Sequence, residues 1–194
     1  EAVLKIAGLL EIPPAQVADF VSEPLIKAVV AQRSIKSDEE IRQIELALDI
    51  AYEMQTTAMK MAKPGVYERQ VAGAMEGIAL SRGGRLSFPT IFSVHGEILH
   101  NHYHGNLMKA GDIAVNDSGA ETALGYASDI TRTIPISGKF SQRQREIYSI
   151  VFDAQRKAIE AVASGVEFRD VHRLAAKILV SGLKDLGLVK GHID

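Results

Sequence analysis

From Ser37 onward, apolar residues recur every three or four positions along the chain. This spacing puts one apolar stripe on an α-helix and predicts a long amphipathic helix. Ser37 and Glu40 form an S-x-x-E capping box where the pattern begins, and the sequence KPG, which starts at Lys63, ends it. The apolar positions are Ile41, Ile44, Leu48, Ala51, Met54, Ala58 and Met61.

The segments on either side of this helix also have helical patterns. A second helix is predicted from about Tyr67 to Arg82, ended by Gly83 and Gly84. Residues 1–36 have apolar clusters interrupted by prolines but no residues typical of a functional site. We therefore expect residues 1–36 to form short helices and to be the remnant or linker of a preceding N-terminal domain.

The pattern changes to short segments rich in β-branched and aromatic residues between Leu86 and Ile136. Glycine-containing turns separate these segments, which is typical of antiparallel strands. Strands flanked by long helices indicate an α/β (α+β) fold class. The four segments read LSFPTIFSV, EILHNHY, DIAVNDSG and SDITRTIPI.

Helical patterns return after Gly138, with a second capping box at Ser141 and Gln144. One helix is predicted to about Ala163 and another from about Phe168 to Leu186. The junctions PGVYERQV and SGVEFRDV share four residues at an offset of 100 positions, which indicates an internal repeat. In the first copy strands follow the second helix, whereas the second copy stops at that point, so we expect the chain to be cut before its second set of strands.

Composition narrows the kinds of site that are possible. The chain has no cysteine, so neither a disulfide nor a thiolate ligand is available. The net charge of −2 gives no reason to expect nucleic acid or an anionic membrane as a partner. No apolar run is long enough to cross a bilayer, and we expect a cytoplasmic protein.

Three of the six histidines, His100, His102 and His104, alternate within five residues. On a strand they would share a face, and an H-x-H pair can chelate zinc. The outer two would lie ~13 Å apart, too far to share one tetrahedral ion. His104 precedes a turn-like Gly-Asn pair and should leave the strand. The alternative that remains open is a set of exposed or hydrogen-bonded histidines at a strand end.

Two aspartates, Asp117 and Asp129, occupy predicted strands, where aspartate is disfavoured. A hairpin centred on Ala123 would pair Asp117 with Asp129, Ser118 with Ser128 and Gly119 with Ala127. Directly opposed side chains lie ~5 Å apart, so the two carboxylates would repel unless one keeps a proton or a cation lies between them. Carboxylates that bridge two ions are the arrangement of two-metal hydrolases.

The motifs RSIKSDEEI, ILHNHYHGN, VNDSGAE and YASDITRTIPISGKFSQRQREIY resemble those of one peptidase group. They are similar to the Xaa-Pro aminopeptidase and prolidase group of pita-bread (creatinase-like) metallopeptidases, from about Arg33 to the end of the chain. The resemblance implies the first half of a pseudo-twofold pita-bread fold in residues 37–194. It also implies that Asp117 and Asp129 are ligands of a dinuclear site, most often holding Mn²⁺, with Co²⁺ or Zn²⁺ possible. His100 would then be catalytic, and His102 and Thr131 would have supporting or substrate-contacting roles.

Two features depart from the family pattern. The interval from Asp117 to Asp129 is 12 residues, one longer than the usual spacing, which predicts an extra residue in the turn. The remaining family ligands, one histidine and two glutamates, have no matching motif, and they are expected to lie outside this chain. His172 lies on an amphipathic helix and His192 in the tail, and neither has a ligand motif.

The sequence thus favours a fragment of an Xaa-Pro aminopeptidase, inactive alone, acting on peptides with proline in second position. The alternatives are an Xaa-Pro dipeptidase and a metal-free pita-bread module that binds proteins. A single-metal H-x-H enzyme on a β-barrel is disfavoured by the four long helices. We expect the intact protein to be a homo-oligomer.

Overall fold

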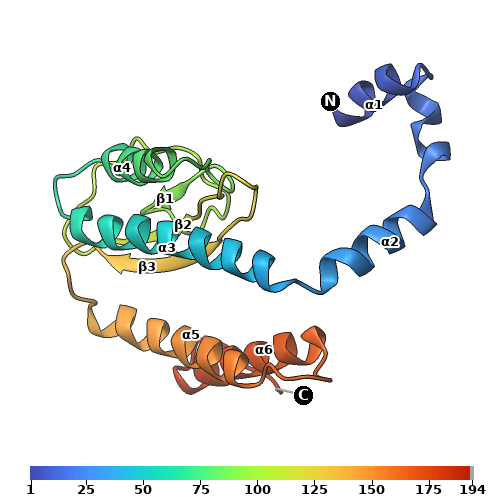
Figure 1. Cartoon of the computed structure of the whole chain (residues 1–194). Helices are drawn as coiled ribbons and strands as arrows, with labels where there is room; N and C mark the ends of the chain where they lie inside the picture. Colours follow the sequence, from blue (N-terminus) through green and yellow to red (C-terminus); the bar gives the residue numbers. More distant parts are fainter. Residues whose placement is uncertain (193–194) are drawn as a thin grey trace. The chain divides into compact units, whose positions relative to one another are not determined.

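Along residues 1–192, the part of the chain that the computed structural model describes, a series of helices is followed by three short strands and then by two more helices (Figure 1). The strands form one antiparallel sheet in the order β1-β2-β3. The elements are α1 (Ala2–Leu10), the 3-10 helix η1 (Pro14–Phe20), α2 (Glu23–Ser34), α3 (Asp38–Met61), α4 (Glu68–Ser81), β1 (Ile91–Ser93), β2 (Ile113–Ser118), β3 (Ile130–Pro135), α5 (Gln142–Glu160) and α6 (Phe168–Asp185).

The chain divides into two compact units, and the boundary falls within α3, between Leu46 and Ala47. The first unit holds the predicted short helices α1, η1 and α2. Pro24 does not interrupt a helix, because it lies in the first turn of α2, where its missing N–H costs nothing. The helical prediction for residues 1–36 is therefore confirmed.

Both predicted capping boxes form. Ser37 N donates to Glu40 Oε2 (2.7 Å), and Glu40 N donates to Ser37 Oγ (3.3 Å), at the start of α3. Ser141 and Gln144 make the same exchange at the start of α5, with distances of 2.9 and 3.3 Å. Each box satisfies two amide groups that the first helical turn leaves unpaired, which fixes where the helix begins.

The two repeat junctions have the same backbone conformation. Gly65 and Gly165 have φ angles of +86° and +84°. Val66 N and Val166 N each donate to the carbonyl three residues earlier, at 3.2 and 3.1 Å. The residues that precede α4 and α6 are both extended, with ψ angles of 145° and 140°. The internal repeat predicted from the sequence is therefore confirmed at these junctions.

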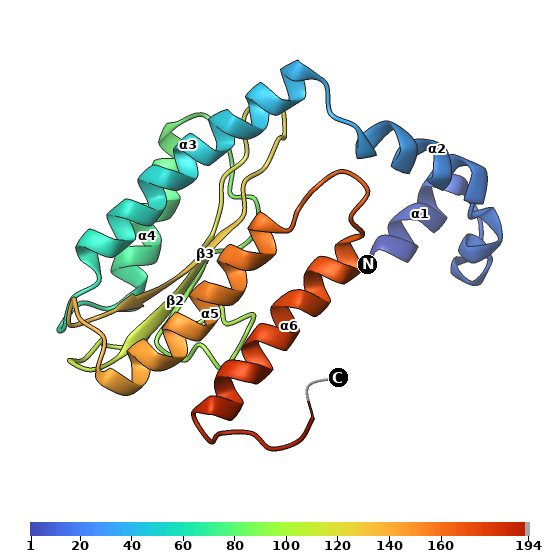
Figure 2. The ribbon, with the colours of Figure 1, turned by 90° about the horizontal axis from the view of Figure 1, so that it is seen from below.

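The core lies between the sheet and the helices α3 and α4, which cover one face of it; α5 lies over the other face (Figure 2). Burial alternates along β2, so that Ala114, Asn116 and Ser118 face α3 and α4. The core residues are Met54, Ala58, Ala62, Val71, Ala72, Met75, Ala79, Phe92, Met108, Ala114, Ala120, Ile134 and Ile136.

The register of β2 and β3 differs by two residues from the prediction. Asp117 pairs with Thr131 rather than with Asp129, and Ser118 pairs with Ile130 rather than with Ser128. The turn is centred on Leu124, because Thr122 N donates to Tyr126 O (2.9 Å) and closes a three-residue loop, inside which Gly125 N donates to Thr122 O (2.9 Å).

The predicted strand over residues 97–103 is wrong, because these residues form turns and irregular backbone. The Asn101 side chain competes with strand pairing by bonding to nearby groups. Its Nδ2 donates to Ser93 Oγ, and its Oδ1 accepts from Tyr103 N, both at 3.0 Å. The alternating histidines therefore do not share a strand face.

Gly119 is required by the close approach of two backbone segments beyond the paired strands. A Cβ at this position would lie 1.9 Å from the carbonyl oxygen of Ser128. We expect Gly119→Ala to lower the free energy of unfolding by roughly 3 kcal/mol, because the two segments would have to separate. Gly77→Ala is the matched control on α4, where a Cβ meets nothing within 4 Å. It should raise the free energy of unfolding by about 0.5–1 kcal/mol.

Urea unfolding of both variants measures these changes. Equal effects of the two substitutions would contradict the close approach at Gly119.

Candidate metal centre

Asp117 and Asp129 lie on the same face of the sheet, although they are not directly opposed. Asp117 pairs with Thr131, and Asp129 precedes Thr131 by two residues. Alternate residues of a strand share a face, so Asp129 is the diagonal neighbour of Asp117. Diagonal neighbours are about 7–8 Å apart at the backbone, a separation that two carboxylate side chains can largely close.

The two carboxyl groups interact electrostatically. The pKa of Asp129 is raised above its ordinary value, and the first cause is partial withdrawal of its carboxyl group from water. The negative charge of Asp117 is the second cause. The third is a hydrogen bond to Asp117, which only protonated Asp129 can donate. A proton relieves the repulsion of this pair, and a bound cation would relieve it in the same way.

Thr131 fixes the orientation of one carboxylate. Its Oγ1 donates a hydrogen bond of 2.8 Å to Asp117 Oδ1 across the β2–β3 pair. Thr131 is exposed and Asp117 half-buried, so this contact lies on the open face of the sheet. It is the kind of contact through which a neighbouring hydroxyl orients a metal ligand.

The opposite face of the same strands is held by a buried amide, Gln55 of α3, which is 4% exposed. Gln55 Nε2 donates to Ile130 O (2.7 Å), next to Asp129, and to Ser118 Oγ (3.2 Å), next to Asp117. Gln55 Oε1 accepts from Asn116 Nδ2 (2.8 Å). One side chain thus connects the two strands at the points where the carboxylates emerge.

The three histidines lie in the segment between β1 and β2. His100 and His102 are exposed, and His104 is half-buried with its Nε2 at 3.1 Å from Thr90 O. Within residues 1–192, no three His, Asp or Glu side chains come together as a group that could hold an ion. The structure therefore brings Asp117, Asp129 and Thr131 together and does not add a histidine to this set.

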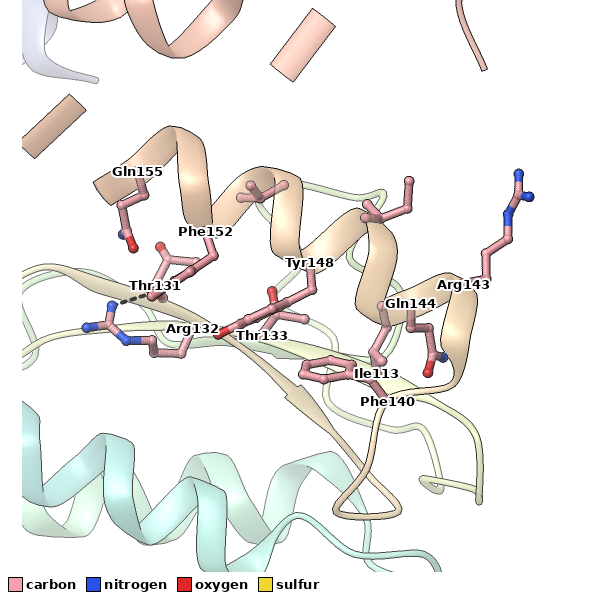
Figure 3. Close-up of a pocket in the computed structure, with 12 residues that line it drawn as sticks. Ile113, Thr131, Arg132, Thr133, Phe140, Arg143, Gln144, Tyr148, Phe152 and Gln155 are labelled. Atoms are coloured by element: carbon pink, nitrogen blue, oxygen red, sulfur yellow. Dashed lines mark hydrogen bonds between the residues drawn. The ribbon is translucent and has the colours of Figure 1, made fainter. Parts of the chain in front are cut away.

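An aromatic groove of about 470 Å³ adjoins the carboxylates, between β3 and α5 (Figure 3). Phe140, Tyr148 and Phe152 point toward the sheet, with ring centroids of successive pairs 4.6 and 6.4 Å apart. Thr131 lines this groove and also contacts Asp117, so the groove and the carboxylate pair share a wall.

The described part of the chain also bears on membrane association. In residues 1–192, no helix combines the length and apolar character that crossing a bilayer requires.

Comparison with known proteins gives the class to which this helix-covered antiparallel sheet belongs, that of the metallopeptidases. The profile of metallopeptidase family M24 matches residues 42–193, and the chain belongs to this family. The resemblance seen in the sequence motifs is thereby confirmed.

Particular relatives are Xaa-Pro aminopeptidases. That of Escherichia coli is 38% identical over 165 residues, which cover 84% of this chain and 37% of the relative. That of Haemophilus influenzae is 37% identical over 169 residues, covering 84% and 38%. The chain thus spans about 37–38% of the length of these curated relatives.

Solved structures show the same fold. A glutamate-to-alanine variant of E. coli aminopeptidase P in complex with substrate matches with a TM-score of 0.78 and 38% identity, over 82% of this chain and 37% of that one. A putative aminopeptidase P from Bacillus anthracis matches with a TM-score of 0.80 and 28% identity, over 84% and 40%. The mixed α/β prediction and the pita-bread fold are therefore confirmed.

Two supporting residues were not predicted from the sequence. Gln55 appears only as one polar position within the α3 pattern, and Glu68 only as an acidic residue in the first turn of α4. Both are buried, and their partners lie between 26 and 75 residues away. A polar residue at a position that helical spacing would bury is the one signal the sequence offers.

The raised pKa of Asp129 predicts how stability depends on pH. Folded Asp129 binds its proton more tightly than the unfolded chain does. Its contribution to the free energy of unfolding is therefore fully present below the ordinary carboxyl pKa and lost as pH rises through the raised pKa. We expect Asp117→Asn to move the Asp129 pKa back toward its ordinary value and to flatten this slope, because the neighbouring charge is gone.

Carbon-13 NMR titration of the Asp129 carboxyl group and urea unfolding between about pH 3 and pH 7 measure both effects. Asp185→Asn on α6 removes the same charge elsewhere and should change neither. An Asp129 pKa that does not respond to Asp117→Asn would contradict the pairing.

Proposed function

We propose that the chain is part of a divalent-metal-dependent Xaa-Pro aminopeptidase. The enzyme would hydrolyse the bond between an N-terminal residue and a proline in second position. The observation that carries the proposal is the repelling pair Asp117 and Asp129 on one face of the sheet. Membership of family M24 and the Xaa-Pro aminopeptidase relatives support it.

The donor set fits hard divalent ions, because carboxylate oxygens are the ligands that Mn²⁺ prefers. We propose two ions, most often Mn²⁺, with Co²⁺ or Zn²⁺ as substitutes; a zinc-substituted E. coli aminopeptidase P in complex with product is among the similar structures. When bound, the ions would supply a water of lowered pKa. The other ligands would come from outside this chain, so the chain alone should be inactive.

Each candidate site residue has a defined task in this proposal. Asp117 and Asp129 bind the ions, and Thr131 holds Asp117 in place through its 2.8 Å hydrogen bond. His100 donates a hydrogen bond to the oxygen of the scissile carbonyl as negative charge develops there. His102 supports His100 or contacts substrate. Assembly of the intact enzyme into a homo-oligomer is part of the same proposal.

Two alternatives use the same fold. A metal-free module that binds proteins has no need of two neighbouring carboxylates, and the charge of Asp117 contributes, after partial burial, to the raised pKa of Asp129. An Xaa-Pro dipeptidase would use the same carboxylates and differ in how it limits substrate length. Cleavage of a tripeptide and a dipeptide that both contain Xaa-Pro distinguishes the two peptidases.

Replacing either carboxylate should remove the metal. In the complete enzyme we expect Asp117→Asn and Asp129→Asn each to lose bound metal, because the amide keeps the size but not the charge. Elemental analysis after dialysis measures the metal content, and Asp112→Asn, at the turn before β2, is the control that should stay loaded. Full metal content in either site variant would show that the assigned residue is not a ligand.

Replacing His100 should slow turnover without removing metal. We expect His100→Ala in the complete enzyme to lower kcat by ~10²–10³, as loss of one oxyanion donor does. Steady-state kinetics with an Xaa-Pro peptide and metal analysis of the same sample measure both. Loss of metal, with turnover restored on reconstitution, would make His100 a ligand instead.

Activity of this chain alone tests the incomplete ligand set. Asp117 and Asp129 leave most coordination positions unfilled, and no third His, Asp or Glu joins them within residues 1–192. We therefore expect no cleavage of an Xaa-Pro peptide by the 194-residue chain with excess Mn²⁺, whereas the complete enzyme cleaves it. Metal-dependent cleavage by the chain alone would contradict this part of the proposal.

A further inference from the structure

Glu68, the first residue of α4, is a completely buried carboxylate with 0% exposure. It accepts hydrogen bonds from two backbone amides, Val94 N to Oε1 (2.8 Å) and Asn106 N to Oε2 (3.2 Å). The side-chain amide of Asn106 donates to both oxygens, at 3.2 and 3.0 Å. All of these donors belong to Val94 and Asn106, which lie 26 and 38 residues beyond Glu68 in the sequence.

The two donors mark the ends of the segment that carries the histidines. Val94 follows β1 directly, and Asn106 lies just beyond His104. By binding both ends, the Glu68 carboxylate closes residues 94–106 into a loop of the Ω type. We call residues 94–106 the histidine loop.

The first turn of α4 adds backbone contacts to the same end of the histidine loop. Glu68 N donates to Asn106 O (3.1 Å), and Arg69 N donates to His104 O (3.0 Å). Inside the loop, Asn101 Nδ2 donates to Ser93 Oγ (3.0 Å). The loop therefore has a defined path between β1 and α4 and does not depend on strand pairing.

The burial of the Glu68 carboxylate strengthens the closure of the histidine loop. An ionised carboxylate away from water is costly unless hydrogen bonds replace its hydration. Here these bonds come from the two ends of the histidine loop, aided by the N-terminal position of Glu68 in α4. Opening the loop would remove the hydrogen bonds that the Glu68 carboxylate accepts from both ends, so these bonds oppose opening.

We propose that Glu68 is a positioning residue, whose carboxylate closes the histidine loop and thereby fixes where His100 stands relative to Asp117 and Asp129. This inference rests on the proposed function for the role of His100. The equivalent position of the internal repeat is Phe168, which is 85% exposed and cannot make such a closure. The closure thus belongs to the copy that carries the histidines.

Glu68→Gln in the complete enzyme tests the inference, because it keeps the size but presents one acceptor oxygen and an NH2 group to the same donors. Glu76→Gln is the matched control, two turns later on α4. We expect the amides of Val94 and Asn106 to exchange with deuterium roughly 10–100-fold faster in Glu68→Gln. The β2 amides and all amides of Glu76→Gln should keep their rates within about twofold.

Kinetics separate positioning from general structure. We expect kcat of Glu68→Gln on an Xaa-Pro peptide to fall roughly 10–100-fold, because a misplaced catalytic group costs rate, while KM and metal content stay near those of Glu76→Gln. If Glu68→Gln does not fold, Asn106→Ala removes the side-chain half of the closure and should give the same pattern.

Unchanged exchange at Val94 and Asn106 would overturn the closure, and faster exchange with unchanged kcat would overturn the positioning role. Failure of the proposed function is a different result, because it appears in the unsubstituted enzyme as absence of Xaa-Pro cleavage.

Discussion

Repulsion between two carboxylates on one face of a small sheet is the constraint on which this site depends. The pKa of Asp129 is raised by partial withdrawal of its carboxyl group from water and by the charge of Asp117, and no third His, Asp or Glu joins the pair within residues 1–192. Strands that carry such a pair tend to separate. The antiparallel register of β2 and β3 and the amide of Gln55 hold them together from the opposite face. The favourable energy of the core and its buried hydrogen bonds thus keeps the two carboxylates on one face of the sheet despite their repulsion.

A buried polar side chain on a helix also holds the histidine loop in place. There the buried polar group is the Glu68 carboxylate, and its partners are two backbone amides and the side-chain amide of Asn106. Gln55 and Glu68 both lie on helices of the core layer and reach segments that carry the candidate site residues. Helices whose positions are fixed by capping boxes and apolar packing thereby hold the strand ends and the loop that carry the candidate site residues. Hydrogen bonds from buried helix residues thus keep the candidate site residues at fixed spacings without a covalent link between their segments.

How much of the fold and of the candidate site could be predicted depends on how far apart in the sequence the interacting residues lie. The helices α3 and α5 follow from local signals, a three-residue capping exchange and a periodic apolar stripe, and both were predicted to within a few residues. That Asp117 and Asp129 share a face followed from alternation along the strands, since a shift of two residues keeps the face. The register itself did not, because it depends on the turn conformation around Gly125 and the contact of Gly119 with Ser128.

The prediction of a strand over residues 97–103 was wrong for a related reason. This segment's short run of apolar and aromatic residues between turns imitates a strand, whereas the side chain of Asn101 and the distant Glu68 help to determine its path. Hydrogen bonds between residues 26 to 75 positions apart, like those of Glu68 and Gln55, leave no pattern in a single sequence. A residue that works through such bonds becomes visible only when the fold brings its partners together.

The central claim is that Asp117 and Asp129 together bind a divalent cation, and paramagnetic broadening by Mn²⁺ tests it most directly. Substoichiometric Mn²⁺ is added to the isotope-labelled chain, and the loss of amide signal is mapped by NMR. The account predicts that broadening is centred on Asp117, Asp129 and Thr131 and disappears in Asp129→Asn. Broadening centred on other carboxylates, or unchanged by Asp129→Asn, would contradict it.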